Sequence, residues 1–552
     1  MSLRFIYGRS GTGKTNYCFK EIAELVSKNN KIYIITPEQF SFTAEQNLMN
    51  AVNSKAVINA EVLTFERMAY RVINEIGGTL KTNLTKSGRA MLLFDILDEN
   101  KNNLKYLGKT QKNIDVISRI ITELKKHNLN SNKLKNLELK IEDKILKYKL
   151  EDINLLLNNY EKEIKNNYID ENDLLTILYE NIDKTGILKD KIIYIDEFAG
   201  FTKQEYLIIE KIIKIAKEIN ISMCTDNLNI NTDPYTDIFY PNKQACNKII
   251  NIAKENNVQI KNPVILNKPY RFKNKELNIL EESLVGNLNE KCDRDIENIK
   301  LYLANNYYGE IEYIANNILD LVKNQKYKYN EIAIITKDIP KYSGLIKSIF
   351  GKYEIPVFID EKQDLSQNIL VKYITAFLDI FAKNWSLESM FNYIKSGFMD
   401  LKLEDIFILE NYCKNLGIKG IKKYTEKWTV ELDGYDLNKL NELRFKIVEP
   451  LVDFRKSLNN NKTVFDITKN IYSFLVKNQI DKKIIEKAEK LQKKGQIDLS
   501  NIYSSSWNIL IEVLDEIVLV LGDKKVSFEK FSELIKVRIK RKFSWKNTCN
   551  IR

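Results

Sequence analysis

The chain has 552 residues, of which 44% are apolar, so it is too long for one hydrophobic core and should form about three or four domains. Its 86 basic and 74 acidic residues give a formal net charge of +12, which suits a nucleic-acid partner without requiring one. A single histidine and six scattered cysteines argue against a zinc site, an iron–sulfur cluster or a catalytic Cys–His pair within this chain. With no signal-peptide pattern and no apolar run long enough to span a bilayer, the sequence predicts a cytoplasmic protein without membrane contact.

The first element is a phosphate-binding loop. Residues 8–15 read Gly-Arg-Ser-Gly-Thr-Gly-Lys-Thr, after an apolar run at residues 3–7 and before a helical pattern at residues 16–27. The glycines let successive N–H groups face one point, and the helix start adds partial positive charge there. A chance glycine-rich turn is the alternative, but the chain has only 19 glycines. The predicted nucleotide-binding residues are Gly8, Arg9, Ser10, Gly11, Thr12, Gly13, Lys14 and Thr15, with Lys14 on the β- and γ-phosphates and Thr15 on Mg²⁺.

Further strands and a long helical segment follow in chain order. Short apolar runs at residues 31–36 and 61–65 predict two more strands. Apolar residues at three- and four-residue spacing then predict helices from about residue 87 to 179, most clearly at residues 110–128 and 144–166. These apolar stripes indicate a helical core rather than a ligand groove.

The next strand, residues 191–197, ends in two carboxylates. In an open α/β sheet such a strand end lies beside the phosphate loop, so Asp196 is predicted to hold Mg²⁺ and Glu197 to orient or deprotonate the attacking water. The alternative is a strand that ends in a solvated acidic turn. The pairing with the loop, and the long helical segment between Lys14 and Asp196, favour a helicase of superfamily 1 over a nucleotide kinase or a small GTPase. Strand signals at residues 219–224 and 263–266 complete the pattern.

Several longer segments carry a specific resemblance. The chain resembles the B subunit of the bacterial AddAB-type helicase–nuclease over nearly its whole length. The matching segments are residues 5–15, 35–45, 62–65, 194–198, 270–272, 309–315, 331–336 and 353–360.

The resemblance implies an α/β fold of the P-loop NTPase class, with the UvrD-like superfamily 1 helicase architecture: parallel-sheet motor domains and large helical insertions. Residues 1–85 and 185–290 would form the first motor domain, and residues 86–184 its helical insert. Residues 291–368 would begin the second motor domain, and residues 369–552 an incomplete helical domain. The family's C-terminal nuclease domain would be absent from this chain.

The resemblance also implies partners and cofactors. The family works as a heterodimer with an A-type subunit and processes double-stranded DNA ends for recombinational repair. ATP and Mg²⁺ would be bound here, whereas the ligands of the family's 4Fe-4S cluster are not in this chain. Arg271 matches the arginine that stabilises the γ-phosphate in superfamily 1 helicases. The alternative for Arg271 is a surface side chain in a loop.

Two segments match those that touch single-stranded DNA in such helicases. The residues concerned are Thr36, Gln39, Phe40, Thr64 and Phe65. The rings of Phe40, Phe42 and Phe65 could stack on bases, but for any one ring packing in the domain core is the favoured interpretation.

Two departures leave the activity open. Residues 198–200 and 225–227 lack the glutamines that processive motors carry after their Asp-Glu pair and on the next strand. An ATP-binding scaffold without motor activity therefore stays an alternative, as does an autonomous DNA-dependent ATPase of superfamily 1.

The end of the chain is the second departure. Residues 370–552 predict helices, with one starting at Glu449–Pro450. The residues after about Lys540 differ from the family's continuation, which favours a truncated product, and Cys549 matches no cluster ligand. A split second motor domain would expose apolar surface and unpaired sheet edges beyond about residue 290.

Overall fold

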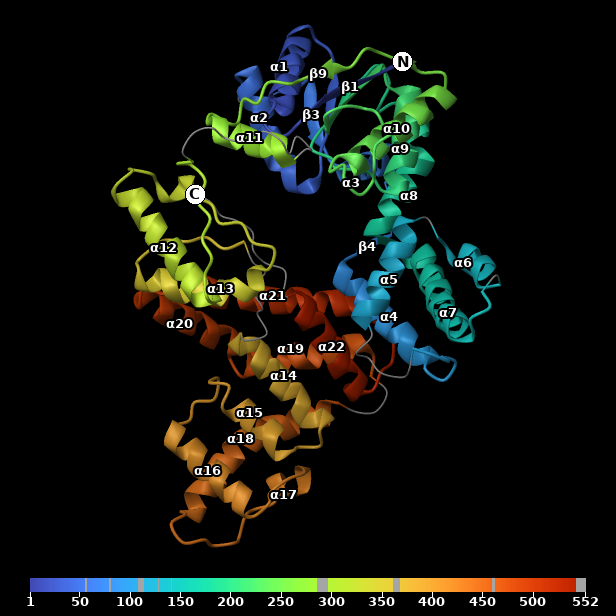
Figure 1. The fold of residues 1–552 in the computed structure, drawn as a ribbon. Helices are drawn as coiled ribbons and strands as arrows, with labels where there is room; N and C mark the ends of the chain where they lie inside the picture. Colours follow the sequence, from blue (N-terminus) through green and yellow to red (C-terminus); the bar gives the residue numbers. More distant parts are fainter. Residues whose placement is uncertain are drawn as a thin grey trace. The chain divides into compact units, whose positions relative to one another are not determined.

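The chain folds into two compact units, seen in a computed structural model (Figure 1). One unit contains residues 1–85 and 100–302, and the other contains residues 86–99 and 303–552. The structure describes residues 1–54, 57–78, 81–107, 114–127, 129–139, 141–284, 296–360, 368–458 and 462–542. Cys292, Cys549 and the predicted divergent end beyond residue 542 lie outside these ranges.

The N-terminal unit is built on a seven-stranded sheet with parallel strand pairings, in the order β3-β2-β6-β7-β1-β8 and with β9 also pairing with β1. The predicted α/β fold with a parallel sheet is thereby confirmed. The strands at Ile32–Ile35 and Ile192–Ile195 are uninterrupted apolar runs because helices cover both faces of the sheet. The strands are β1 (Ser2–Gly8), β2 (Ile32–Ile35), β3 (Ala60–Leu63), β6 (Ile192–Ile195), β7 (Glu218–Cys224), β8 (Gln259–Ile260) and β9 (Val264–Ile265).

Alternate strand residues serve two cores. Ile34 and Tyr194 pack with Phe19 on the side of α1 (Lys14–Ser27) and α2 (Ser41–Val52). Ile35 and Ile195 face the opposite core. That core includes residues of α3 (Phe65–Glu75), α8 (Glu171–Asn181), α9 (Lys203–Ile215) and α10 (Tyr240–Glu255). Because the strands are parallel, the segments that follow β1, β2, β3, β6 and β7 all lie at one edge of the sheet.

The predicted helical segment is confirmed in outline, with a small sheet that the sequence did not indicate. Its helices in this unit are α5 (Ile114–Lys126), α6 (Ser131–Glu138), α7 (Lys144–Asn167) and α8, and β4 (Thr82–Leu84) pairs in parallel with β5 (Tyr168–Asp170). Strands of three residues are too short for a period-two pattern to show. Buried Lys125 pairs with Asp170 at 3.2 Å and with Asp173 at 2.8 Å, which joins α5 to this sheet.

Helix α4 (Lys86–Asn100) groups instead with the C-terminal unit. Its Asp95 is buried and pairs with Lys530 at 2.8 Å and with Lys524. The four-part domain division predicted from the sequence stays a prediction.

The regular secondary structure of the C-terminal unit consists of helices in its described residues, and no strand forms there. Helices α12 (Tyr307–Lys323) and α13 (Ile339–Lys352) pack around Ile311, Ile346 and Phe350. The later helices are α14 (Ile369–Ala382), α15 (Leu387–Ile394), α16 (Leu403–Asn415), α17 (Ile421–Thr425), α18 (Leu437–Ser457), α19 (Val464–Lys477), α20 (Ile480–Lys493), α21 (Ile497–Leu521) and α22 (Phe528–Lys542).

The helix start predicted at Pro450 is wrong. Helix α18 begins at Leu437, where the Asp436 side chain accepts a hydrogen bond from Lys439 N at 3.1 Å, and it runs through Pro450. Residues on both sides of the proline, Val448 and Leu451, are buried, so packing outweighs the backbone hydrogen bond that proline removes.

Several apolar side chains between residues 301 and 358 are exposed and belong to no strand. No strand forms within residues 296–360, although residues 331–336 and 353–360 carry strand-like sequence. Ile335 is 95% exposed and Phe358 is 61% exposed, and Leu301 and Leu303 are likewise open to solvent. The exposed apolar surface expected in this region is therefore observed. None of the helices in the described ranges has the length and apolar character that crossing a bilayer requires.

Candidate functional site

The loop at residues 8–15 is held in its conformation by hydrogen bonds among its own residues. Helix α1 starts at Lys14 directly after Gly13, whose φ of 83° lies in the left-handed region. The Lys14 ammonium donates to the carbonyl oxygens of Gly8 and Arg9, both at 2.9 Å, and the Thr12 hydroxyl donates to Arg9 O at 2.9 Å. Two carbonyl groups of the loop thus hold the ammonium group at a helix N-terminus, where partial positive charge attracts phosphate oxygens.

Two glycines of the loop have no room for a side chain. A Cβ at Gly8 would lie 2.2 Å from the Leu266 carbonyl oxygen. A Cβ at Gly11 would lie 2.7 Å from the Arg271 Cβ, and the φ of Gly11 is 79°. The close approach of residues 266–271 therefore depends on these glycines.

The strand end at residues 196–197 meets the loop, as predicted. Asp196 is 5% exposed, and its Oδ1 accepts a hydrogen bond from Glu197 N at 2.9 Å. Glu197 adopts the left-handed region with a φ of 65°, and its Oε1 accepts the Thr15 hydroxyl at 2.8 Å. A non-glycine residue in that region costs about 1–3 kcal/mol and is typical of functional sites. The geometry brings Thr15, Asp196 and Glu197 to one place.

These residues fit Mg²⁺. The second carboxylate oxygen of Asp196 is buried and has no hydrogen-bond partner among the described residues. Burial raises the pKa of the Cys18 thiol on α1 well above its ordinary value, and the charge of the nearby Asp196 is the next largest cause. Hydroxyl and carboxylate oxygens are hard donors, and Mg²⁺ commonly takes only one or two protein ligands together with phosphate oxygens.

The segment after β9 forms a further wall of the site. Arg271 N donates to Gly11 O at 3.1 Å, and its guanidinium donates to the Ser10 hydroxyl at 3.3 Å. The mostly exposed Tyr270 ring lies 3.4 Å from where a Cβ of Gly13 would stand. The structure therefore brings Arg271 onto the loop and adds Tyr270, which was not among the predicted site residues although it is adjacent in the same motif.

Arg9 is anchored from the same segment. Its guanidinium pairs with Glu281 at 3.1 Å and with Glu282 at 3.2 Å, both on α11 (Lys275–Leu284). Arg9 thus connects the loop to α11 instead of standing free for phosphate. Glutamates this far along the chain have no sequence signal that links them to the loop.

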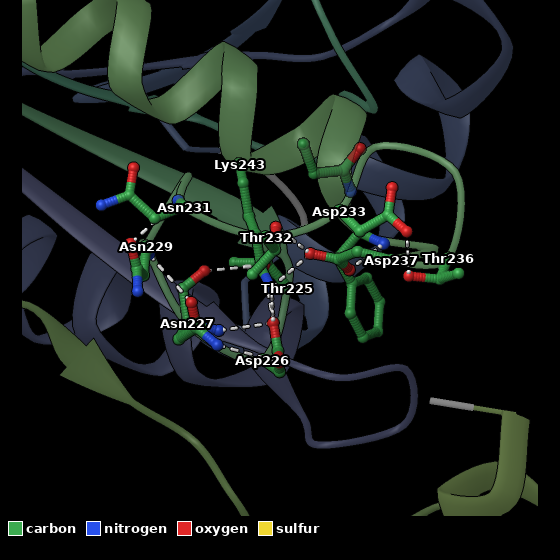
Figure 2. Close-up of polar contacts among 12 residues, drawn as sticks. Thr225, Asp226, Asn227, Asn229, Asn231, Thr232, Asp233, Thr236, Asp237 and Lys243 are labelled. Carbon is green, nitrogen blue, oxygen red and sulfur yellow. Dashed lines mark hydrogen bonds and ion pairs between the residues drawn. The ribbon is translucent and has the colours of Figure 1, made fainter. Parts of the chain in front are cut away.

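A polar loop after β7, whose internal contacts are drawn in Figure 2, is also part of the surroundings of the site. Thr225 N donates to Gly8 O at 3.3 Å, so this loop touches the start of the phosphate loop. The Lys243 side chain is 2% exposed and pairs with Asp226 at 2.8 Å and with Asp237 at 2.7 Å. The buried cation therefore ties α10 to both ends of the loop, and no sequence pattern indicates this role.

Side-chain turns stiffen the same loop. Asn227, Asn229, Asp233 and Asp237 each accept a hydrogen bond from the backbone N–H two residues further on, at 2.8–3.0 Å (Figure 2). Such turns replace backbone pairing where no helix or strand is present.

The Lys243 pairs predict a pH dependence of stability. Burial alone would raise the pKa of Asp237, but hydrogen bonds from Lys243 and Thr232 hold that pKa below its ordinary value. Burial alone would lower the pKa of Lys243, but hydrogen bonds with Asp226 and Asp237 hold it above its ordinary value. Their stabilisation is therefore complete between about pH 4 and pH 10 and is lost as pH falls through the lowered Asp pKa or rises through the raised Lys pKa.

We expect hydrogen-exchange protection of α10 to be flat within that window and to fall on both sides of it. A Lys243→Met variant should lack the alkaline loss. Protection that continues to fall steadily between pH 5 and pH 9 would contradict this role of the ion pairs in the loop.

The five predicted DNA-contact residues lie in different surroundings. Gln39 is exposed and Phe40 is half-buried, in the short turn η1 (Glu38–Phe40) after β2. The side chains of the other three, Thr36, Thr64 and Phe65, are buried. The Phe65 ring packs against Phe198 with a centroid distance of 5.8 Å, as the core interpretation expects. A DNA role stays a prediction, and of these five residues only Gln39 is exposed and Phe40 partly so.

Comparison with known proteins identifies the family. Residues 5–281 match the model of the AddB N-terminal family, and residues 262–538 match that of the UvrD-like helicase C-terminal domain. The chain is 37% identical to a Clostridium botulinum (strain Loch Maree) protein and 38% identical to a Clostridium kluyveri protein. A protein of Caldanaerobacter subterraneus is 36% identical. Each is named as the B subunit of an ATP-dependent helicase/deoxyribonuclease.

These alignments cover 97% of this chain and 48–49% of the relatives. The chain therefore spans about half the length of the curated relatives that it matches. Because the AddB model matches the half of the chain that holds the phosphate loop, and the UvrD-like model matches the rest, the chain belongs to the AddB family.

Proposed function

We propose that this chain is the ATP-binding, helicase-like part of a helicase–nuclease B subunit. The observation that carries the proposal is the convergence of the phosphate loop, the carboxylates after β6 and Arg271 at one edge of the sheet. The hydrogen bond between Thr15 and Glu197 at 2.8 Å joins the first two of these parts directly.

The residues have distinct tasks in this proposal. Lys14 and the loop N–H groups bind the β- and γ-phosphates, and Thr15 and Asp196 hold the Mg²⁺ ion. When bound, Mg²⁺ neutralises charge on the phosphate oxygens. Glu197 accepts a hydrogen bond and so orients a water molecule, and Arg271 stabilises negative charge at the γ-phosphate. Tyr270 adds an exposed ring on which a base can stack.

An ATP-binding scaffold without motor activity is the second candidate. The observation that favours it is the loop after β7, where Asp226 is held by buried Lys243 and no glutamine is present to contact the nucleotide. In a motor, the segment at this place must switch between two conformations. Here side-chain turns and an ion-paired lysine hold the loop in a single conformation.

Thermal unfolding with different nucleotides tests nucleotide binding. ATP and ADP with Mg²⁺ should raise the melting temperature, whereas AMP should not, because the loop binds the phosphates that AMP lacks. A free nucleotide concentration of about 100 times Kd should raise the free energy of unfolding by about 2.7 kcal/mol. Equal effects of AMP and ATP, or none from any nucleotide, would refute the proposed site.

DNA and an A-type subunit are the proposed partners, acting with this chain on double-stranded DNA ends during recombinational repair in the bacterial cytoplasm. The name that the relatives carry and the net charge of +12 support this assignment. Affinity for single-stranded DNA should fall about tenfold or more between about 50 and 200 mM salt, because counterions are released when phosphates are bound. Fluorescence anisotropy measures this, and a salt-independent affinity would count against the DNA partner.

A further inference from the structure

Two buried polar atoms at the carboxyl edge of the sheet lack hydrogen-bond partners. They are the Thr36 hydroxyl, on a residue 1% exposed, and Oδ2 of Asp196. Among the described residues neither atom makes a hydrogen bond. A buried polar group left unsatisfied costs about 1–3 kcal/mol, so each atom calls for a ligand or a water molecule.

The two residues are neighbours in the sheet. Strands β2 and β6 pair in parallel with Ile35 opposite Ile195, and Asp196 N donates to Ile35 O at 3.0 Å. Thr36 and Asp196 are the next residues on the two strands, so their backbones lie about 5 Å apart.

Both side chains also face the same layer. Ile34 and Tyr194, two positions earlier on each strand, pack into the core beneath α1 and α2. Because strand side chains alternate between faces, Thr36 and Asp196 point to that layer as well, which is the layer on which α1 carries Thr15. The influence of Asp196 on the Cys18 thiol of α1 agrees with this direction.

The chemistry of the two atoms is complementary. A hydroxyl is a donor, and an ionised carboxylate oxygen only accepts. Either a direct hydrogen bond after a small side-chain rotation or one bridging water would satisfy both atoms. The burial of Thr36 also removes its hydroxyl from the surface that DNA could reach.

We propose that Thr36 is a positioning residue for the metal site: its hydroxyl donates to the Asp196 carboxylate, directly or through one water, and fixes the orientation in which Asp196 holds Mg²⁺. This inference rests on the proposed nucleotide site and assigns Thr36 to it instead of to DNA. Partners that orient a ligating carboxylate in this way typically change metal affinity by about 10–100-fold.

The test is the Mg²⁺ dependence of binding of a fluorescent ADP analogue to the full chain. Thr36→Val keeps the shape and removes the donor, so the Mg²⁺ concentration at half-effect should rise about tenfold. Affinity in EDTA should stay unchanged. Thr36→Ser restores the hydroxyl and should return the half-effect concentration to that of the unsubstituted chain.

Thr64→Val is the matched control. Thr64 is also buried at a strand end, but its hydroxyl already accepts a hydrogen bond from Arg67 N at 3.1 Å and caps α3. This variant should lose stability without moving the Mg²⁺ half-effect concentration. Circular dichroism without metal should show that Thr36→Val is folded, with at most the small loss of stability that one missing hydrogen bond causes. Thr36→Ala, which also removes the donor, serves as a second variant if Thr36→Val does not fold.

The possible outcomes distinguish the positioning role of Thr36 from the proposed nucleotide binding on which it rests. Nucleotide binding with an unchanged Mg²⁺ half-effect concentration in Thr36→Val overturns the positioning role alone. The same result with weakened DNA binding overturns it in favour of a DNA contact. No nucleotide binding by the unsubstituted chain overturns the proposed function, and the inference with it.

Discussion

Replacing Lys243 by methionine is expected to lower the free energy of unfolding of the N-terminal unit by about 3–5 kcal/mol. The methionine side chain fills similar space but leaves Asp226 and Asp237 without their shared cation. The Asp237 side chain is only 13% exposed, so water would replace its lost partner only in part. Hydrogen exchange of the β7 and α10 amides measures the effect in the full chain, because a chain of two units need not unfold in one step.

Two further variants make this result specific. Lys254→Met changes an exposed lysine on the same helix and should leave protection within about 0.5 kcal/mol of the unsubstituted chain. Adding Asp226→Asn and Asp237→Asn to Lys243→Met removes the unpaired charges and should recover part of the loss. Equal protection in Lys243→Met and Lys254→Met would mean that the ion pairs do not hold the loop.

Replacing Gly11 by valine is expected to weaken nucleotide binding by about 30-fold or more, while the rest of the unit stays folded. A β-branched residue at a φ of 79° costs about 1–2 kcal/mol, and its Cβ would lie 2.7 Å from that of Arg271. Relief of that contact moves either the loop or Arg271, so the two groups no longer meet at the phosphates. Titration with a fluorescent ADP analogue measures the loss.

Gly200→Val is the control for this variant. Gly200 is exposed, a Cβ added there would meet no atom within 4 Å, and its φ is outside the left-handed region. Its replacement should leave nucleotide affinity unchanged. An affinity of Gly11→Val equal to that of Gly200→Val would show that the contact between Gly11 and Arg271 has no part in binding.

The sequence predicted those parts of the site whose signals are local. The phosphate loop, its flanking strand and helix, and the carboxylates after β6 occupy contiguous residues with characteristic spacing. Parallel pairing then explains why Lys14 and Asp196, far apart in the chain, meet at one edge. Arg271 was found through its motif, and the structure adds the contact with Gly11 that places it.

Other features depend on packing that no local pattern reveals. Lys243 looks like any lysine of an amphipathic helix, because its two partners lie in a loop with no periodicity. The local preference of Pro450 predicts a helix start, but the buried face of α18 continues through it. The strand-like residues 331–336 stay unpaired because strand propensity alone supplies no neighbouring strand.

Calorimetric titration of ATP with Mg²⁺ tests most directly whether the loop at residues 8–15 binds nucleotide. The unsubstituted chain and Lys20→Ala, which changes an exposed lysine on the same helix, should bind with equal affinity. Lys14→Ala should bind about tenfold to a hundredfold more weakly, because hydrogen bonds to charged groups contribute about 1.5–3 kcal/mol. Equal affinity in all three proteins, or no heat of binding in the unsubstituted chain, would contradict nucleotide binding by this loop.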